Sequence, residues 1–217
     1  MNRNYIHNNY LLKSSLAEEL YHSWAKDLPI MDYHNHLNPR DLASNEQFAN
    51  IVEAWVTSDP YKHRVMRICG VEENKITGDA PDEEKFFQWA KFFPKMLGNP
   101  LYYWSVLELK RIFNIDELLS EENAKEIWNS CNNILQKNGF GFVDILEKFN
   151  AETLCTSDDL LSDLSYHKKA TAEQNINVYQ SLRGDTAITV HFTGSDDWFN
   201  KLKHQTNQNI HSLEEYE

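Results

Sequence analysis

Apolar side chains recur every three or four residues over three long stretches of this 217-residue chain, as they do in amphipathic helices. The stretches are residues 10–27, residues 39–67, which turn-forming residues interrupt, and residues 71–150. Ser14 is a candidate N-cap of the first stretch, and Pro29 ends it. Most of the chain is therefore predicted to be helical.

Three shorter stretches have the pattern of strands, namely residues 29–34, 151–157 and 176–183. A helical pattern at 159–174 separates the last two, and we expect Asp158 and Asp159 to cap that helix. Strands that alternate with helices predict a parallel sheet, and hence an α/β protein. The interval between the first two strands is too long for a simple crossover, so residues 71–150 are predicted to be a helical insertion.

This pattern divides the chain into three predicted parts. Residues 1–70 hold the N-terminal helix, the first strand and the helices that follow it. Residues 71–150 form the insertion, and residues 151–217 hold the second and third strands with their helices.

The composition excludes some classes of binding partner and indicates the cellular compartment. A formal charge of −12 disfavours nucleic acid and anionic membrane surfaces, because both would repel the chain. Cys69, Cys131 and Cys155 are odd in number and far apart, which is typical of reduced thiols. The sequence has no apolar run of about 18 residues and no secretory leader pattern. We therefore expect a soluble cytoplasmic protein.

The stretch LPIMDYHNHLNP carries the most specific chemistry. His34 and His36 are two residues apart at the end of a predicted strand, so both imidazoles project from one face. Imidazole nitrogens are good ligands for zinc, manganese and iron, and active sites form at the carboxyl ends of parallel strands. The spacing alone leaves a metal site and an ordinary polar loop as equal alternatives.

The order apolar strand, Asp-x-His-x-His-Leu, Pro resembles the first-strand motif of the amidohydrolase superfamily, whose members are distorted (β/α)8 barrels. More closely, the chain resembles the uronate (glucuronate) isomerase family. The resemblance rests on MDYHNHLNP, DPYKHRVMRICGVEENKITGDA, GNPLYYWSVLELKRIF, LCTSDD and DLSYHKKA, which occur in family order. It implies an α/β fold that is the N-terminal part of a distorted TIM-like barrel, with a large helical insertion.

The resemblance also implies an activity, the aldose–ketose interconversion of hexuronates: D-glucuronate to D-fructuronate and D-galacturonate to D-tagaturonate. His34 and His36 match the family's metal ligands, with zinc expected and manganese or iron as alternatives. Tyr61 matches a tyrosine that lies beside the substrate, and Arg183 is the candidate for holding the sugar. The aromatic side chains of the insertion would be core residues and subunit contacts of a homo-oligomer.

Two positions depart from the family pattern. Many members have a histidine immediately before the tyrosine, where this chain has Pro60. His63 follows about one helical turn later and is the obvious substitute as a catalytic group. Gly184 replaces the usual proline after Arg183 but leaves the arginine in place.

The largest departure from the family pattern is the length of the chain. A complete eight-stranded barrel needs about 250 residues, and three strands are predicted here. We therefore interpret the chain as an N-terminal fragment of a uronate isomerase, inactive by itself. Two alternatives stay open at this point: a metal-dependent hydrolase of the same superfamily, and a non-catalytic helical interaction module.

Overall fold

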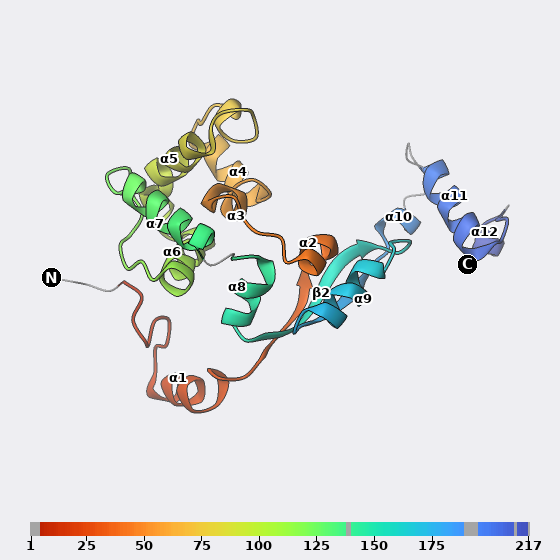
Figure 1. The fold of residues 1–217 in the computed structure, drawn as a ribbon, viewed down its shortest axis with the longest axis horizontal. Coiled ribbons are helices and arrows are strands. Elements are labelled where there is room, and N and C mark those ends of the chain that lie inside the picture. The colour runs from red at the N-terminus through yellow and green to blue at the C-terminus, as the bar shows by residue number, and fades with distance from the viewer. Residues whose placement is uncertain (1–4, 138–139, 189–194, 211, 217) are drawn as a thin grey trace. The chain divides into compact units, whose positions relative to one another are not determined.

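The computed structural model describes residues 5–137, 140–188, 195–210 and 212–216 (Figure 1). The chain divides into two compact units, each made of two segments. One unit comprises Met1–Leu28 and Glu46–Lys148, and is called the helical unit below. The other comprises Pro29–Asn45 and Phe149–Glu217, and is called the sheet unit.

The sheet unit is built on three parallel strands in the order β1-β2-β3. They are β1 (Ile30–Asn35), β2 (Ala151–Asp159) and β3 (Asn177–Arg183). The β2–β3 pairing is regular over seven residues, whereas β1 pairs with β2 through two register shifts. The predicted strands and their parallel arrangement are confirmed, with ends that differ by one or two residues.

Helices cover one face of this sheet. They are α2 (Pro39–Ser44) and α9 (Ser165–Glu173), which contact each other, and α9 also packs on β3 (Figure 1). The buried residues Leu154, Thr156 and Val178 point toward this layer. Tyr179, on the opposite face, is 56% exposed. Short helices complete the unit: α10 (Asp185–Ile188), α11 (Ser195–Thr206) and α12 (Leu213–Tyr216).

The expected capping role of Asp158 and Asp159 is wrong. Strand β2 continues through Asp159, and α9 begins only at Ser165, with Leu164 at the N-cap position. Because both residues still belong to β2, their carboxylates do not reach the first turn of α9. Asp158 instead contacts the ring of His167 on α9, and Asp159 accepts from the indole of Trp198 on α11.

The helical unit contains the predicted insertion. Its helices are α1 (Ser15–Leu20), a π-helical turn (Tyr21–Ala25), α3 (Ile51–Trp55), α4 (Pro60–Ile68), α5 (Asp82–Phe92), α6 (Pro100–Phe113), α7 (Ala124–Lys137) and α8 (Phe142–Lys148), with 3-10 turns at Glu73–Lys75 and Phe93–Met96. In the described part of this unit, strand pairing is limited to one bridge between Gln47 and Gly141. The mostly helical prediction is confirmed.

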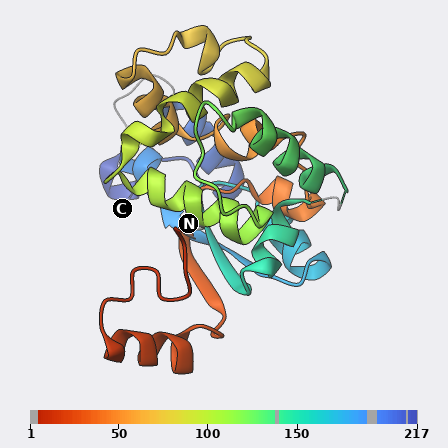
Figure 2. The ribbon, with the colours of Figure 1, turned by 90° about the vertical axis from the view of Figure 1, so that its left-hand side faces the viewer.

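One apolar core holds helices α3 to α7 together (Figure 2). Phe86, Trp89 and Phe93 are completely buried, and the ring of Phe93 stacks on Tyr102 with 4.7 Å between centroids. Residues 51–68 share this core, so the unit boundary lies before α3 and differs from the expected boundary at residue 70. The apolar faces of α3 and α4 are buried against the insertion.

The N-terminal helix behaves differently from the other amphipathic helices. Its cap is as predicted, because the hydroxyl of Ser14 accepts from the amide of Ala17 at 3.1 Å. Its apolar residues Leu16, Leu20 and Trp24 are nevertheless 61%, 53% and 71% exposed. The periodicity therefore predicted the helix correctly, although the apolar face is not buried in this chain.

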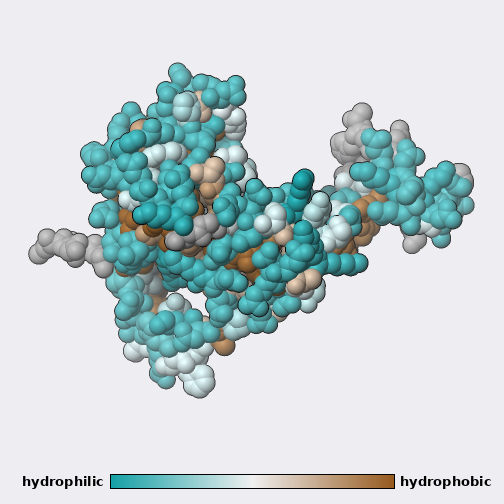
Figure 3. Space-filling view, in the orientation of Figure 1, coloured by the Kyte–Doolittle hydropathy of each residue, from teal (hydrophilic) through white to brown (hydrophobic). Residues whose placement is uncertain are grey.

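The surface drawn in Figure 3 is mostly hydrophilic, with separate small apolar areas. All three cysteines are free thiols, as expected from their spacing. Among the helices of the described ranges, none combines the length and the apolar composition that a membrane span requires.

An ion pair between the half-buried Asp59 and the buried Lys62 fixes the start of α4. The carboxylate of Asp59 accepts from the amides of Tyr61 and Lys62, at 2.9 and 3.1 Å, and Pro60 occupies the first helical turn. The ammonium of Lys62, whose side chain is 9% exposed, lies 2.8 Å from the same carboxylate. It also lies 5.8 Å from the ring centroids of Trp55 and Trp89. Burial acts to raise the pKa of Asp59, but the Lys62 ammonium and the two amides outweigh it and lower the pKa.

We expect Asp59→Ala to lower the free energy of unfolding by roughly 3–5 kcal/mol, the cost of leaving a buried charge without its partner. Urea unfolding at neutral pH measures it. Because the folded pKa of Asp59 lies below its unfolded value of about 3.9, this stabilisation is present above that pH and is lost as the pH falls further.

The matched control is Glu121→Ala, which removes an exposed partner of Lys91 at 3.6 Å in the same unit. Its effect should be below about 1 kcal/mol. Equal losses in Asp59→Ala and Glu121→Ala would contradict the importance of the Asp59–Lys62 pair.

Candidate active site

The carboxyl end of β1 presents two histidines together. His34 is in the strand and His36 follows it, both are exposed, and their ring centroids lie 5.1 Å apart. Two imidazoles that share a tetrahedral ion through metal–nitrogen bonds of about 2.0–2.1 Å have centroids roughly 5 Å apart. The observed spacing therefore fits a common ion.

Local hydrogen bonds hold this histidine segment. The carboxylate of Asp32 accepts from the backbone amide of His34 and from the side-chain amide of Asn35, both at 3.2 Å. Immediately after the pair, the side chain of Asn38 accepts from the amide of Arg40 at 3.0 Å and caps α2. The pair is thus fixed on both sides by side-chain bonds to the backbone.

A second strand contacts the first histidine. Oγ of Ser157, on β2, lies 3.2 Å from Nδ1 of His34. Ser157 is not among the residues predicted for the site, although it belongs to a polar run, TSDD, at the end of a predicted strand. That run was the available signal.

Arg183 reaches the same face from β3. Arg183 pairs in register with Asp159, and two positions earlier Ser181 pairs with Ser157. Because side chains alternate between the two faces along a strand, Ser157, Ser181 and Arg183 lie on the same face. Two strand spacings, about 9–10 Å, separate β1 from β3. Nε of Arg183 donates to Asp185 at 2.7 Å, and the side chain is 52% exposed. The structure therefore brings Arg183 and the histidine pair to one face and one end of the sheet.

Asp159 anchors the segments that follow β3. Its carboxylate accepts from the hydroxyl of Thr186, from the amide of Leu161 at 2.9 Å and from the indole of Trp198 at 3.2 Å. Burial acts to raise the pKa of Asp159, and these bonds lower it overall. The carboxylate acts as a structural anchor for α10 and α11.

A buried polar network lies on the helix-covered face of β2. Nε2 of His167, on α9, lies 2.9 Å from Oγ1 of Thr156 and 3.1 Å from the carboxylate of Asp158. The Thr156 hydroxyl also lies 2.5 Å from that carboxylate. Thr156 is completely buried and His167 is 4% exposed, so the network ties α9 to the strand. Sequence reasoning missed it because no spacing links these positions.

Tyr61 and His63 belong to the helical unit. Tyr61 is 69% exposed at the start of α4. His63 is 9% exposed, and its Nε2 lies 2.5 Å from the carbonyl oxygen of Val56. That bond favours a structural role for His63 between α3 and α4, and its catalytic role stays a prediction.

Two histidines are an incomplete ligand set. Within the residues that the structure describes, no three His, Cys, Asp or Glu side chains are grouped so that they could hold a metal ion. A catalytic zinc ordinarily has three protein ligands and an open position. The pair fits part of such a site, and at least one further ligand would have to come from elsewhere.

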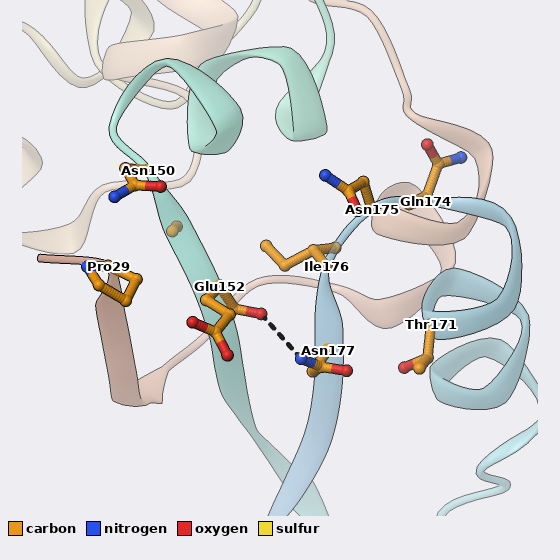
Figure 4. Close-up of a pocket in the computed structure, with 9 residues that line it drawn as sticks. Pro29, Asn150, Glu152, Thr171, Gln174, Asn175, Ile176 and Asn177 are labelled. Atoms are coloured by element: carbon orange, nitrogen blue, oxygen red, sulfur yellow. Dashed lines mark hydrogen bonds between the residues drawn. The ribbon is translucent and has the colours of Figure 1, made fainter.

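A cavity of about 280 Å³ lies at the opposite end of the sheet (Figure 4). Pro29, Glu152 and Asn177 line it at the amino ends of the three strands, and Asn177 donates to the carbonyl of Glu152 at 3.3 Å. In parallel α/β proteins this end contributes to stability, and chemistry occurs at the carboxyl ends. The cavity is therefore not the candidate site.

Three parallel strands with helices on one face, and with polar side chains gathered at the carboxyl ends of the strands, are the arrangement found in part of a (β/α) barrel. The sequence model of the family described as glucuronate isomerase matches residues 1–216. The chain belongs to this glucuronate isomerase family.

Curated and solved relatives agree with this assignment. The uronate isomerases of Bacillus subtilis and Bacillus pumilus are 43% and 46% identical over 96% and 93% of this chain. The crystal structure of uronate isomerase from Thermotoga maritima superposes on 98% of the chain with a TM-score of 0.91 and 35% identity. Glucuronate isomerase from Caulobacter crescentus shares the fold, with a TM-score of 0.88 at 23% identity. The chain spans 44% and 41% of the Bacillus proteins and 47% of the Thermotoga chain.

The network on β2 predicts that Thr156→Val destabilises the protein. The substitution removes a buried hydroxyl that contacts Asp158, His167 and the carbonyl of Tyr179, whereas His167 and Asp158 keep their contact with each other. Losing these hydrogen bonds costs roughly 1–3 kcal/mol. Thermal unfolding monitored by circular dichroism measures the loss. Thr153→Val is the matched control, since Thr153 is a buried threonine of the same strand outside this network. A loss no larger than that of Thr153→Val would show that the network contributes no stability.

Proposed function

We propose that the whole protein to which this chain belongs interconverts aldose and ketose forms of hexuronates, D-glucuronate with D-fructuronate and D-galacturonate with D-tagaturonate. The observation that carries the proposal is the family match over residues 1–216. The chain supplies the first three strands of the barrel with their histidine pair and arginine. The remaining strands, and the further groups they carry, would come from the part that its relatives have in addition.

His34 and His36 are proposed to hold one divalent metal ion. Their spacing of 5.1 Å supports this assignment, and zinc, manganese and iron all accept imidazole nitrogen. Such an ion, when bound, would supply a positive charge that stabilises negative charge on a sugar oxygen. The role of the two imidazoles is to fix the position of that charge at the end of β1.

Arg183 is proposed to bind the carboxylate of the sugar. Its bond to Asp185 uses Nε, so the N–H groups of its two Nη atoms are further donors for a carboxylate. The distance of two strand spacings between β1 and β3 is comparable to the length of an extended six-carbon chain. Arg183 would thus select a uronate over a neutral sugar and place its reacting end near the histidine pair.

Tyr61 is proposed to donate or relay a proton. The isomerisation removes the proton from C2, passes through an enediol and returns a proton to C1, while the oxygen-bound proton moves from O2 to O1. The assignment of Tyr61 rests on the resemblance of DPYKHR to the family motif. His63 is the alternative proton carrier, but its Nε2 is held by the Val56 carbonyl, so Tyr61 is the stronger candidate.

A hybrid enzyme tests the proposed function. Residues 1–217 are joined to the part of the Bacillus subtilis relative that lies beyond the matched segment, which makes a complete barrel. We expect the hybrid to convert D-glucuronate to the ketose, measured by chromatography of the sugars. Replacing His34 and His36 together with alanine should remove both the bound metal and the activity.

His204→Ala is the matched control, because His204 is an exposed histidine on α11. It should keep metal and activity at the level of the parent hybrid. A folded hybrid that forms no ketose but hydrolyses an ester or amide would support the alternative hydrolase. A folded hybrid with neither activity would favour a non-catalytic module.

Tyr61→Phe in the hybrid should lower kcat by roughly 10²–10⁴-fold, the usual contribution of one general acid–base group. The free energy of unfolding should not change, because Tyr61 is 69% exposed. Tyr166→Phe, on a partly exposed tyrosine of α9, is the control and should leave kcat unaltered. A near-parental kcat in Tyr61→Phe would assign proton transfer to another group.

A further inference from the structure

The contact between β1 and β2 points to one more residue of the metal site. Oγ of Ser157 lies 3.2 Å from Nδ1 of His34. We propose that Ser157 is a positioning residue that accepts a hydrogen bond from Nδ1–H of His34 and so leaves the lone pair of Nε2 free to bind the metal. The proposal rests on the metal site of the proposed function and adds a residue to it.

The chemistry of imidazole gives this contact its consequence for metal binding. A neutral imidazole carries one N–H and one lone pair, and only the nitrogen with the lone pair can bind a metal ion. In water the Nε2–H form is the more populated one, and it would present the wrong atom. A serine hydroxyl can donate to Nδ1 or accept from it, and it is the accepting arrangement that leaves the Nε2 lone pair to the metal. Metal-bound histidines ordinarily donate their second ring N–H to an acceptor in this way.

The sheet holds the Ser157 hydroxyl in position. Ser157 lies within the regular part of the β2–β3 ladder, where it pairs with Ser181, so its Cα and Cβ are fixed by backbone bonds on that side. On the other strand, the carboxylate of Asp32 holds the backbone amide of His34. The imidazole is therefore fixed both at its backbone and at Nδ1 before a metal arrives.

Ser181 provides a matched comparison on the neighbouring strand. It has the same side chain, the same face and the register position opposite Ser157. Its hydroxyl donates to the carbonyl of Thr156 at 2.9 Å, a backbone group, whereas Ser157 contacts a histidine ring. Replacing Ser181 should perturb the sheet end to a similar degree without affecting the tautomer of His34.

Nitrogen-15 NMR of the hybrid barrel, labelled at its histidine rings, tests the proposal directly. Spectra of the histidine rings are recorded without metal near pH 8, above the ordinary imidazole pKa of about 6.5, and the His34 signals are assigned by their loss in His34→Gln. We expect His34 to carry its proton on Nδ1. Ser157→Ala should return the ring to the Nε2–H form, whereas Ser157→Thr, which retains the hydroxyl, and Ser181→Ala should leave it unchanged.

A zinc titration of the same samples, followed at the Nε2 signal of His34, gives the second readout. Ser157→Ala should raise the zinc concentration for half-saturation about 10–100-fold, the usual effect of losing such a partner. Ser157→Thr and Ser181→Ala should keep the parental value.

The possible failures are distinguishable. If zinc does not affect His34 in the parent hybrid, which has the remaining strands of the barrel, the metal site of the proposed function is contradicted. If zinc binds but Ser157→Ala changes neither the tautomer nor the half-saturation, the role of Ser157 is overturned. An Nε2–H tautomer in the parent hybrid overturns it as well.

Discussion

The parallel pairing of β1 with β2 is the constraint on which the candidate site depends. A long helical segment separates the two strands in the sequence, yet Ile30 pairs with Ala151 and Asn35 with Thr156. This pairing places His34 beside Ser157, and the regular β2–β3 ladder then brings Arg183 to the same end. Without it, the histidines would be isolated polar residues at the end of an exposed strand.

The insertion can be long because it forms its own core. Helices α3 to α7 bury Phe86, Trp89 and Phe93 among themselves, so the segment between β1 and β2 does not depend on the sheet for burial. The same unit buries the ammonium of Lys62, where the carboxylate of Asp59 and two indole rings offset the loss of its hydration. The charge that stabilises the start of α4 also sets the position from which Tyr61 extends.

Much of the fold could be predicted from the sequence. The period of apolar residues identified the helical insertion, and the short apolar runs identified all three strands, because these signals are local. The end of β2 could not be predicted, since TSDD has the composition of a helix cap, and it is the pairing of residues 156–159 with residues 180–183 that keeps it in the strand. The exposure of Leu16 and Trp24 could not be predicted either, because an amphipathic pattern predicts a helix but does not identify the element that covers its apolar face.

The candidate site shows the same limit. The motif DYHNH identified His34 and His36, and the resemblance identified Arg183 and Tyr61. Ser157 and His167 were missed, because their roles come from contacts between elements that no spacing in the sequence encodes. The burial of His63 also depends on the tertiary packing of α3 against α4.

His34 in β1 and His36 directly after it are proposed to bind one metal ion. Anomalous diffraction at the zinc edge, from crystals of the hybrid barrel grown with zinc, tests this proposal most directly. The account predicts a single peak about 2.0–2.1 Å from ring nitrogens of both His34 and His36, with Nε2 of His34 facing the ion. A peak bound by other residues, or by only one of the two histidines, would contradict it.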